Sequence, residues 1–361
     1  MATPYPIQAN NRTYMVVDDC ITSWIALITG SVTDEILGNF DASGFEVAAD
    51  RLGVGFAAKE TGLYAVTGRP DEAFPNLTMA PDAVNLTLTA PGFQSQTLHV
   101  TIPQNATFPV IATPVSLRRL PVLIQGRVVS KINRAPIAGA SIVPIDNPIT
   151  PPTIHTLALR SPLYLPHADT TAIQSVTITP GGGATLNEDA LAGSATITLS
   201  DRTGLVLNSI VQLSNASGTV VEYGIVLDPG PGTANTPGTV TLRQPLNRSY
   251  TAGAPTTIQF VTAAPAGGPA QLKGNANAGD GVVLATQLLT GPTVVIESGN
   301  PAAVEYHELG ALTDADGYYI LNGVGRVGEI FLQAVKGVSK SAPADWFVRY
   351  ERNINIVDFI L

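Results

Sequence analysis

Asp314 and Asp316 stand one residue apart, directly before Gly317, in the segment TDADGYYILNGV. Carboxylates at this spacing are compatible with a calcium-binding loop, an acid/base pair of an enzyme, or a tight turn before a β-strand. A calcium loop of the EF-hand type requires ligands at positions 1, 3 and 5 and a bidentate glutamate at position 12. Counted from Asp314, position 5 is Tyr318 and position 12 is a glycine, so the calcium pattern ends after its third residue. We predict a turn, in which the aspartate caps the backbone and Gly317 adopts a positive φ.

No other group of residues has a spacing typical of catalysis or metal binding. The histidines show neither a His-x-x-Glu nor a His-Glu-x-x-His pattern, and we expect those of the Pro-rich segment to be exposed. The four are His99, His155, His167 and His307. The sequence contains no Gly-x-Ser-x-Gly motif, and the lone cysteine, Cys20, lies in an apolar stretch that predicts a buried, unreactive thiol. We therefore predict that the protein is not an enzyme and has no catalytic residues, cofactor or metal.

The composition argues against a nucleic-acid partner and for contacts with other protein subunits. The 361 residues carry a net charge of -9, with 28 Asp and Glu against 19 Lys and Arg, whereas nucleic-acid binding requires clustered cations. Only 13% of the residues are charged and 45% are hydrophobic, which indicates that other subunits cover part of the surface. No apolar run is long enough to span a bilayer, and residues 1–16 lack the pattern of a secretory signal. We expect synthesis in the cytoplasm.

The hydrophobic pattern predicts a nearly all-β protein with an internal repeat. Segments such as VNLTLTA, QTLHVTI and GTVTLRQ alternate between apolar and polar residues and are bounded by turn residues. ALITGSVTDEI (26–36) parallels VLIQGRVVSKI (122–132), and TGLYAVTG (61–68) parallels DGYYILNG (316–323). The key glycines are 32 positions apart in the first copy (30 and 62) and 191 apart in the second (126 and 317), a difference of 159. The spacing predicts an insertion of about that size in the second copy, because a structureless loop of that length is implausible.

These repeated residues resemble the carboxypeptidase regulatory-like domain, a seven-stranded β-sandwich of the transthyretin type. The second copy carries its Gly-x-Val (126–128), Pro-x-x-Gly-Ala (136–140) and Thr-Asp-x-x-Gly-x-Tyr-x-Leu (313–321) elements. The first copy lacks the Pro-x-x-Gly-Ala element but keeps Thr-Gly-Leu-Tyr (61–64) and Ala-Pro-Gly-Phe (90–93). The resemblance implies two sandwiches and no zinc site, since this domain is not the peptidase itself.

The first copy also bears on the turn. Gly62 occupies the place of Gly317, and the residues beside it in Thr61-Gly62-Leu63-Tyr64 include no carboxylate. The repeat therefore favours a structural turn at both sites over a calcium loop.

We predict an all-β fold of two β-sandwiches, the second interrupted by an inserted β-domain. The expected parts are an N-terminal arm (1–13), a first sandwich (14–117), a split second sandwich (118–147 and 304–361) and an inserted β-domain with Pro/Gly-rich linkers (148–303). We expect residues 184–262 of the insert to fold independently of the host sandwich. Phrases of the insert such as AGSATI (192–197) and DRTGLV (201–206) are similar to β-modules of phage tail and tail-like proteins.

The C-terminal segment DWFVRYERNINIVDFIL alternates and then becomes continuously apolar. Two interpretations are open: the strand completes the second sandwich, or it pairs with the sheet edge of another subunit. The candidate interface residues are Trp346, Ile354, Ile356, Phe359 and Leu361.

Together these features predict a structural adaptor, cap or baseplate-type protein of a phage-tail-like contractile injection particle. The expected partners are other particle subunits, in a homo-oligomer that could form a symmetric ring, with no nucleic acid and no membrane span. The particle would be either membrane-associated or released. The alternative is a surface-binding module, such as a fibre-like adhesin or a carbohydrate or receptor binder, although fold alone cannot assign such a site.

Overall fold

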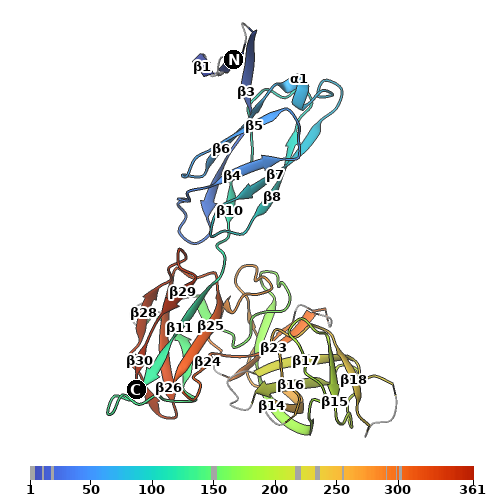
Figure 1. Ribbon diagram of the computed structural model, residues 1–361, viewed down its shortest axis with the longest axis vertical. Coiled ribbons are helices and arrows are strands. Elements are labelled where there is room, and N and C mark those ends of the chain that lie inside the picture. Colours follow the sequence, from blue (N-terminus) through green and yellow to red (C-terminus); the bar gives the residue numbers. More distant parts are fainter. Residues whose placement is uncertain are drawn as a thin grey trace. The chain divides into compact units, whose positions relative to one another are not determined.

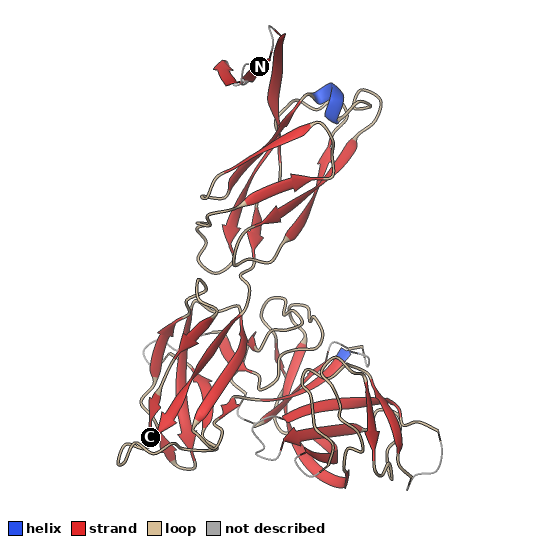
Figure 2. Cartoon of the chain, in the orientation of Figure 1, coloured by secondary structure: helices blue, strands red, loops and turns tan. Residues whose placement is uncertain are grey.

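The computed structural model describes residues 5–9, 12–17, 20–147, 153–215, 221–231, 236–253, 256–289, 291–297, 299–300 and 303–361. The chain divides into two compact units, Met1–Leu120 and Pro121–Leu361. Strands make up nearly all of the regular structure in both (Figures 1 and 2), which confirms the predicted all-β fold. The α-helix α1 (Pro70–Ala73) is a single turn in the first unit.

The first unit is a β-sandwich with an extended hairpin at its N-terminal end. One sheet has the order β1-β2-β3-β6-β5, with β9 and β10 also paired to β3, and the other has the order β4-β7-β8. The strands of the first sheet are β1 (Tyr5–Ala9), β2 (Arg12–Val17), β3 (Cys20–Asp34), β5 (Val54–Ala58), β6 (Leu63–Gly68), β9 (Val110–Ile111) and β10 (Val115–Leu117). Those of the second are β4 (Glu46–Ala49), β7 (Asp82–Thr89) and β8 (Gln96–Ile102).

The two sheets of this unit enclose one hydrophobic core. Alternate residues of β3, β6 and β7 point inward, among them Ile28, Val66 and Leu86, and all three are nearly inaccessible to solvent. Burial of one face of each sheet is what the period-two pattern of the sequence demands.

The second sandwich is assembled from the two ends of the second unit. One sheet has the order β25-β11-β29, with β30 also paired to β11, and the other has the order β24-β12-β26-β27, with β28 also paired to β26. The first sheet comprises β11 (Val122–Val129), β25 (Tyr318–Val324), β29 (Ile354–Ile356) and β30 (Phe359–Ile360). The second comprises β12 (Ser141–Ile145), β24 (Ala311–Leu312), β26 (Glu329–Lys336), β27 (Ser339–Lys340) and β28 (Ala344–Phe347).

The insert lies between β12 and β24, which pair with each other at Ser141 and Leu312. Its main sheet has the order β15-β18-β17-β16-β19-β14-β22-β23, with β20 also paired to β14, and β13 pairs with β21 separately. These strands are β13 (His155–Ala158), β14 (Ala172–Ala184), β15 (Thr196–Leu199), β16 (Ile210–Asn215), β17 (Val221–Asp228), β18 (Gly238–Leu242), β19 (Thr256–Pro265), β20 (Ala270–Gln271), β21 (Val282–Ala285), β22 (Thr293–Glu297) and β23 (Val304–Glu308). The insert therefore interrupts the hairpin of β12 and β24, and the host sandwich is formed by the chain segments on either side of it.

The structure corrects two predictions about the insert. The described parts of its Pro/Gly-rich flanks (153–166 and 262–281) are not linkers, because they supply β13 and β20 and buried core residues such as Leu159, Leu163 and Leu272. The independent folding of residues 184–262 stays a prediction: this segment has its own hydrophobic core, with Leu199, Leu213 and Val240 at its centre, although β19 also pairs with β14. The return to the host sandwich also comes later than position 304, because Val304–Glu308 pairs with β22 of the insert.

The two sandwiches share one arrangement around a glycine of the first strand. Gly30 lies opposite Tyr64, and Gly126 lies opposite Tyr319, in matching antiparallel registers. Both tyrosines are buried, and a Cβ added at Gly30 would lie 2.3 Å from the Tyr64 hydroxyl oxygen. A Cβ at Gly126 would lie 1.8 Å from the carbonyl oxygen of Val357. Each glycine is therefore required for close approach rather than for flexibility.

A second glycine in each copy forms the turn directly before the strand that carries the buried tyrosine, β6 or β25. Gly62 and Gly317 have φ values of +83° and +77°. The amide of Val32 donates to the Gly62 carbonyl at 2.9 Å, and the amide of Val128 donates to the Gly317 carbonyl at 2.8 Å. Because the left-handed region excludes most side chains and both positions touch neighbouring backbone, glycine is needed at each.

We predict that Gly317→Ala destabilises the second unit by about 2–4 kcal/mol, from left-handed strain together with steric overlap. The added Cβ would lie 2.6 Å from the Val128 carbonyl oxygen. Gly337→Ala is the matched control, because its φ is +59° but nothing lies within 4 Å of its added Cβ. It should cost about 1 kcal/mol. Urea unfolding measures both, and equal losses in the two variants would contradict the steric argument.

A pair of deletions tests where the insert begins and ends. Replacing residues 148–308 by a short Gly/Ser loop should join β12 to β24 as a hairpin and leave a soluble protein that unfolds cooperatively. Replacing residues 151–281 instead should cause aggregation, because β22 and β23 would lose β14 and expose Val294 and Ile296, both now fully buried. Size-exclusion chromatography and thermal unfolding distinguish the two. A soluble, cooperative protein after the 151–281 deletion would restore the linker interpretation.

Candidate functional site

The aspartate pair at residues 314 and 316 forms a turn in the structure. The Asp314 carboxylate oxygen Oδ1 accepts hydrogen bonds from the amides of Asp316 at 3.0 Å and Tyr318 at 2.9 Å. The Asp314 amide donates to the Tyr318 carbonyl, and the Gly317 amide donates to the Asp314 carbonyl. This carboxylate oxygen is thus occupied by the backbone of its own turn, as in other Asx turns.

The C-terminal segment pairs within the chain. β29 and β30 both run parallel to β11, with Gln125 opposite Ile356 and Val128 opposite Phe359. The first sandwich ends in the same way, with β9 and β10 parallel to β3. Of the two interpretations of the C-terminal strand, the structure adopts the one in which it completes the second sandwich.

This pairing divides the five candidate interface residues. Phe359 is only 3% exposed and packs against Tyr319 at a ring-centroid distance of 6.0 Å, so it is corrected from an interface residue to a core residue. Trp346 is half-buried and its indole nitrogen donates to Asn355 at 3.2 Å, which ties it to its own sandwich. Leu361 is half-buried, and its backbone bonds to Val129 and Lys131. Ile354 and Ile356 remain exposed.

Ile354 and Ile356 belong to a larger apolar surface, which we call the outer face of the β25–β11–β29 sheet. Its members come from three paired strands and are Leu123, Gln125, Arg127, Tyr318, Ile320, Ile354 and Ile356. The exposed fractions of Tyr318, Ile320, Ile354 and Ile356 are 52%, 50%, 44% and 60%. The outward face of a solvated sandwich is usually polar, so the large apolar side chains exposed here make this face a candidate contact surface.

The outer face also contains one cation over an aromatic ring. The Arg127 guanidinium lies 5.1 Å from the centroid of the Tyr318 ring, and its Nε donates to the carbonyl of Asp316 at 3.0 Å. These contacts orient the exposed ring of Tyr318. The first sandwich exposes apolar side chains at the equivalent positions, where Leu63 and Ile111 are 53% and 81% exposed.

A buried carboxylate, Glu305, lies within hydrogen-bond distance of two histidines, and the sequence analysis did not predict that these histidines are neighbours. His167 Nε2 lies 3.1 Å from one oxygen of Glu305 and His307 Nε2 lies 2.9 Å from the other. The amides of Tyr164 and Leu165 donate to the same carboxylate. Burial would raise the pKa of Glu305, but these hydrogen bonds outweigh it and lower the pKa to about 2.

The charge of Glu305 also determines how the two rings are protonated. An ionised carboxylate only accepts hydrogen bonds, so each Nε2 carries the proton in this arrangement. The Nδ1 atoms of His167 and His307 are buried and have no hydrogen-bond partner among the described residues. The prediction that His167 is exposed is wrong, because the Pro-rich flank packs against the insert sheet. The spacing of Glu305 and His307 on one strand, which places both on one face, is the sequence signal for this cluster.

A second buried carboxylate, Glu222 on β17, binds the same flank. It accepts hydrogen bonds from the hydroxyls of Tyr164 and Tyr250 and from the amide of Asn247. Burial, together with the adjacent Glu222 charge, raises the pKa of both tyrosines, so the hydroxyls stay protonated as donors. Tyr164 thus bridges Glu222 and Glu305. This hydrogen-bond network anchors the flank to the insert sheet and does not have the geometry of a reactive centre.

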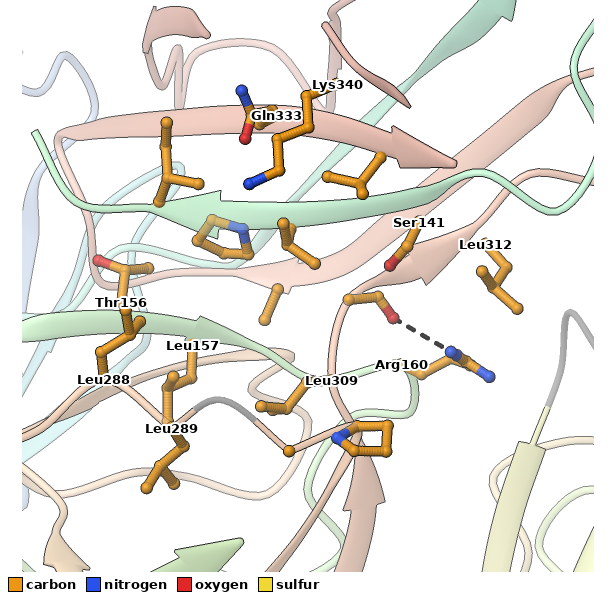
Figure 3. Close-up of a pocket in the computed structure, with 18 residues that line it drawn as sticks. Ser141, Thr156, Leu157, Arg160, Leu288, Leu289, Leu309, Leu312, Gln333 and Lys340 are labelled. Carbon is orange, nitrogen blue, oxygen red and sulfur yellow. Dashed lines mark hydrogen bonds between the residues drawn. The ribbon is translucent and has the colours of Figure 1, made fainter. Parts of the chain in front are cut away.

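A largely apolar cavity of about 630 Å³ lies between the second sandwich and the insert (Figure 3). Its walls come from β12, β13, β24, β26 and the segment before β22. Arg160 and Lys340 are the basic residues at its edge, and the Arg160 Nε donates to the Gly310 carbonyl at 3.4 Å.

Two other features are absent from the described residues. Within that part of the chain, no group of three or more His, Cys, Asp or Glu side chains is arranged to hold a metal ion. None of the helices there has the length and apolar character required to cross a membrane.

Comparisons with known proteins add little. No protein-family model matches the chain, and no curated protein sequence matches it. Among solved structures, it is similar to a variant of BcpA, the major pilin subunit of Bacillus cereus, with 10% identity, coverage of 92% of this chain and 97% of that chain, and a TM-score of 0.19. It is also similar to a streptococcal ancillary pilin, with 8% identity, coverage of 92% and 98%, and a TM-score of 0.18. Likenesses at such TM-scores carry no argument about function.

We predict that the Glu305 cluster stabilises the second unit by an amount on the order of 3 kcal/mol, from the lowered pKa of Glu305. Because its folded pKa lies below the unfolded value of about 4.3, this contribution is complete above that pH and is lost as the pH falls toward 2. Glu305→Gln should lower the free energy of unfolding at pH 7. Glu297→Gln, an exposed position on β22, is the control. Urea unfolding at pH 7 measures the stability of both variants, and urea unfolding of the wild type from pH 5 to 2 measures the pH dependence. Equal stability of the two variants would contradict the prediction.

Proposed function

We propose that this chain is a non-enzymatic structural subunit that assembles with other protein subunits, as an adaptor, cap or baseplate-type component of a phage-tail-like contractile injection particle. The observation that carries the proposal is the outer face of the β25–β11–β29 sheet. Four large apolar side chains lie exposed on it in neighbouring strands, where a sheet facing only water would present polar groups.

The repeat adds a second argument for assembly. Leu63 and Ile111 in the first sandwich occupy the positions of Tyr318 and Ile356 in the second, and all four side chains are exposed. One chain thus offers two related apolar patches. Contacts between two different patches are of the head-to-tail kind, and they close into rings when the rotation permits.

The type of particle rests on the sequence resemblance of the insert to phage-tail β-modules and of the two repeats to regulatory-like sandwiches. The low charge of the chain supports the same proposal, because only 13% of its residues are charged. Contact surfaces that are covered in an assembly lack the charges that keep a free surface solvated.

The proposal predicts that Ile320→Asp combined with Ile356→Asp weakens assembly by about tenfold or more, because two charges would be buried at the centre of the contact. Both side chains are at least half exposed, so the fold should persist. Ile132→Asp is the control, since Ile132 is 95% exposed in the turn after β11. Light scattering coupled to size-exclusion chromatography measures self-association, and co-purification with tube, sheath and baseplate proteins measures partner binding.

Two outcomes would count against this function. Wild-type protein could remain monomeric at high concentration and bind none of the particle proteins. Alternatively, the double variant could assemble as well as wild type does, which would move the contact to another surface.

A further inference from the structure

The outer face of the second host sheet is apolar where the insert approaches it. Val143 and Ile145 on β12 and Val335 on β26 point away from the sandwich core and line the cavity. The insert covers this face with Leu157 and Leu289, yet leaves about 630 Å³ between the two walls. Pockets of 300–1,000 Å³ with mainly apolar walls are the usual size and character of small-molecule sites.

The charges at the edge of this cavity are of one sign. Lys340 and Arg160 line it, whereas none of the described lining residues carries a carboxylate. Arg160 is already paired with Glu308, and nearby Asp146 pairs with His155 at 2.9 Å. Lys340 makes no ion pair with any described residue. Of the two cations that line the cavity, Lys340 is therefore the one with no ion pair among the described residues, and it is exposed.

The lysine of the cavity lies apart from two of its leucines. Figure 3 shows Lys340 and Gln333 on the side opposite Leu288 and Leu289. The Gln333 amide nitrogen donates to the Ser341 carbonyl at 2.8 Å, which fixes the orientation of that side chain beside Lys340. A ligand that matches this arrangement has an apolar body at the leucines and an anionic head at Lys340.

We propose that this cavity binds a monomeric anionic amphiphile, a molecule with a medium-length apolar chain and a single carboxylate. The apolar body is held by burial against Val143, Leu157, Leu289 and Val335, since removing apolar surface from water is favourable. The carboxylate lies at Lys340, an exposed lysine at the edge of the cavity, where opposite charges attract. This site is on the β24–β12–β26 sheet, and the proposed assembly surface is on the other sheet, so the two proposals stand separately.

The test uses the full chain and laurate, below its critical micelle concentration, in isothermal titration calorimetry. We expect saturable binding of one laurate per chain. Dodecyltrimethylammonium, with the same chain length and opposite charge, should bind about tenfold more weakly or worse, and Lys340→Gln should weaken laurate binding about fivefold. Lys131→Gln, an exposed lysine in the turn after β11, should leave laurate affinity unchanged.

A cavity-filling variant tests the location. Val143→Trp should abolish laurate binding while leaving thermal stability near that of wild type, and Thr156→Trp fills the cavity from the opposite wall should the first variant misfold. Equal affinity for laurate and the cationic amphiphile would overturn the proposal, as would binding that survives both tryptophan variants. Binding only to anionic phospholipid vesicles, or only to an apolar peptide with a free C-terminus, would replace the monomeric amphiphile with that ligand.

Discussion

The close approach of a tyrosine strand to a glycine on the first strand organises both sandwiches. In the second copy, the Val357 carbonyl passes so close to Gly126 that no side chain fits there, and it accepts the Tyr319 hydroxyl at 2.6 Å. The Val357 amide in turn donates to the Gln125 carbonyl at 2.8 Å. One glycine thus allows β25, β11 and the C-terminal segment to meet. The first copy repeats the backbone part of this pattern, with the Ala112 amide donating to the Thr29 carbonyl at 2.8 Å, whereas the Tyr64 hydroxyl is buried without a hydrogen-bond partner among the described residues.

The same constraint determines which surfaces are available to partners. Because Tyr319 and Phe359 point into the core, their strand neighbours Tyr318 and Ile360 must point outward. The outer face is therefore a direct consequence of core packing, and its apolar character is a separate property of the sequence. An exposed apolar side chain that packing does not require is the kind of feature that assembly explains.

The insert shows how a host sandwich tolerates a large interruption. Its ends leave and re-enter at β12 and β24, which remain paired, so the core of the host is preserved. Buried Glu222 and Glu305 then fasten the Pro-rich flank to the insert sheet through hydroxyl, imidazole and amide donors. Such carboxylates are costly to bury unless every oxygen is satisfied, and here both oxygens of each accept hydrogen bonds. The cavity lies where this fastened flank faces the apolar outer side of the host sheet.

The sequence by itself determined the features that depend on local spacing: the all-β fold, the two turns at Gly62 and Gly317, and the presence of an insertion between two halves of a repeat. Period-two alternation and glycines at positive φ are local requirements, so one strand and its turn suffice to predict them. The burial of Phe359, the Glu305 cluster and the structured flanks were decided only by the tertiary structure. His167 and Glu305 are 138 positions apart, and their contact depends on how the flank folds back onto β23. A carboxylate is stable in a buried position only when donors from distant parts of the chain fold against it. The spacing of residues within a single strand does not show which donors these will be.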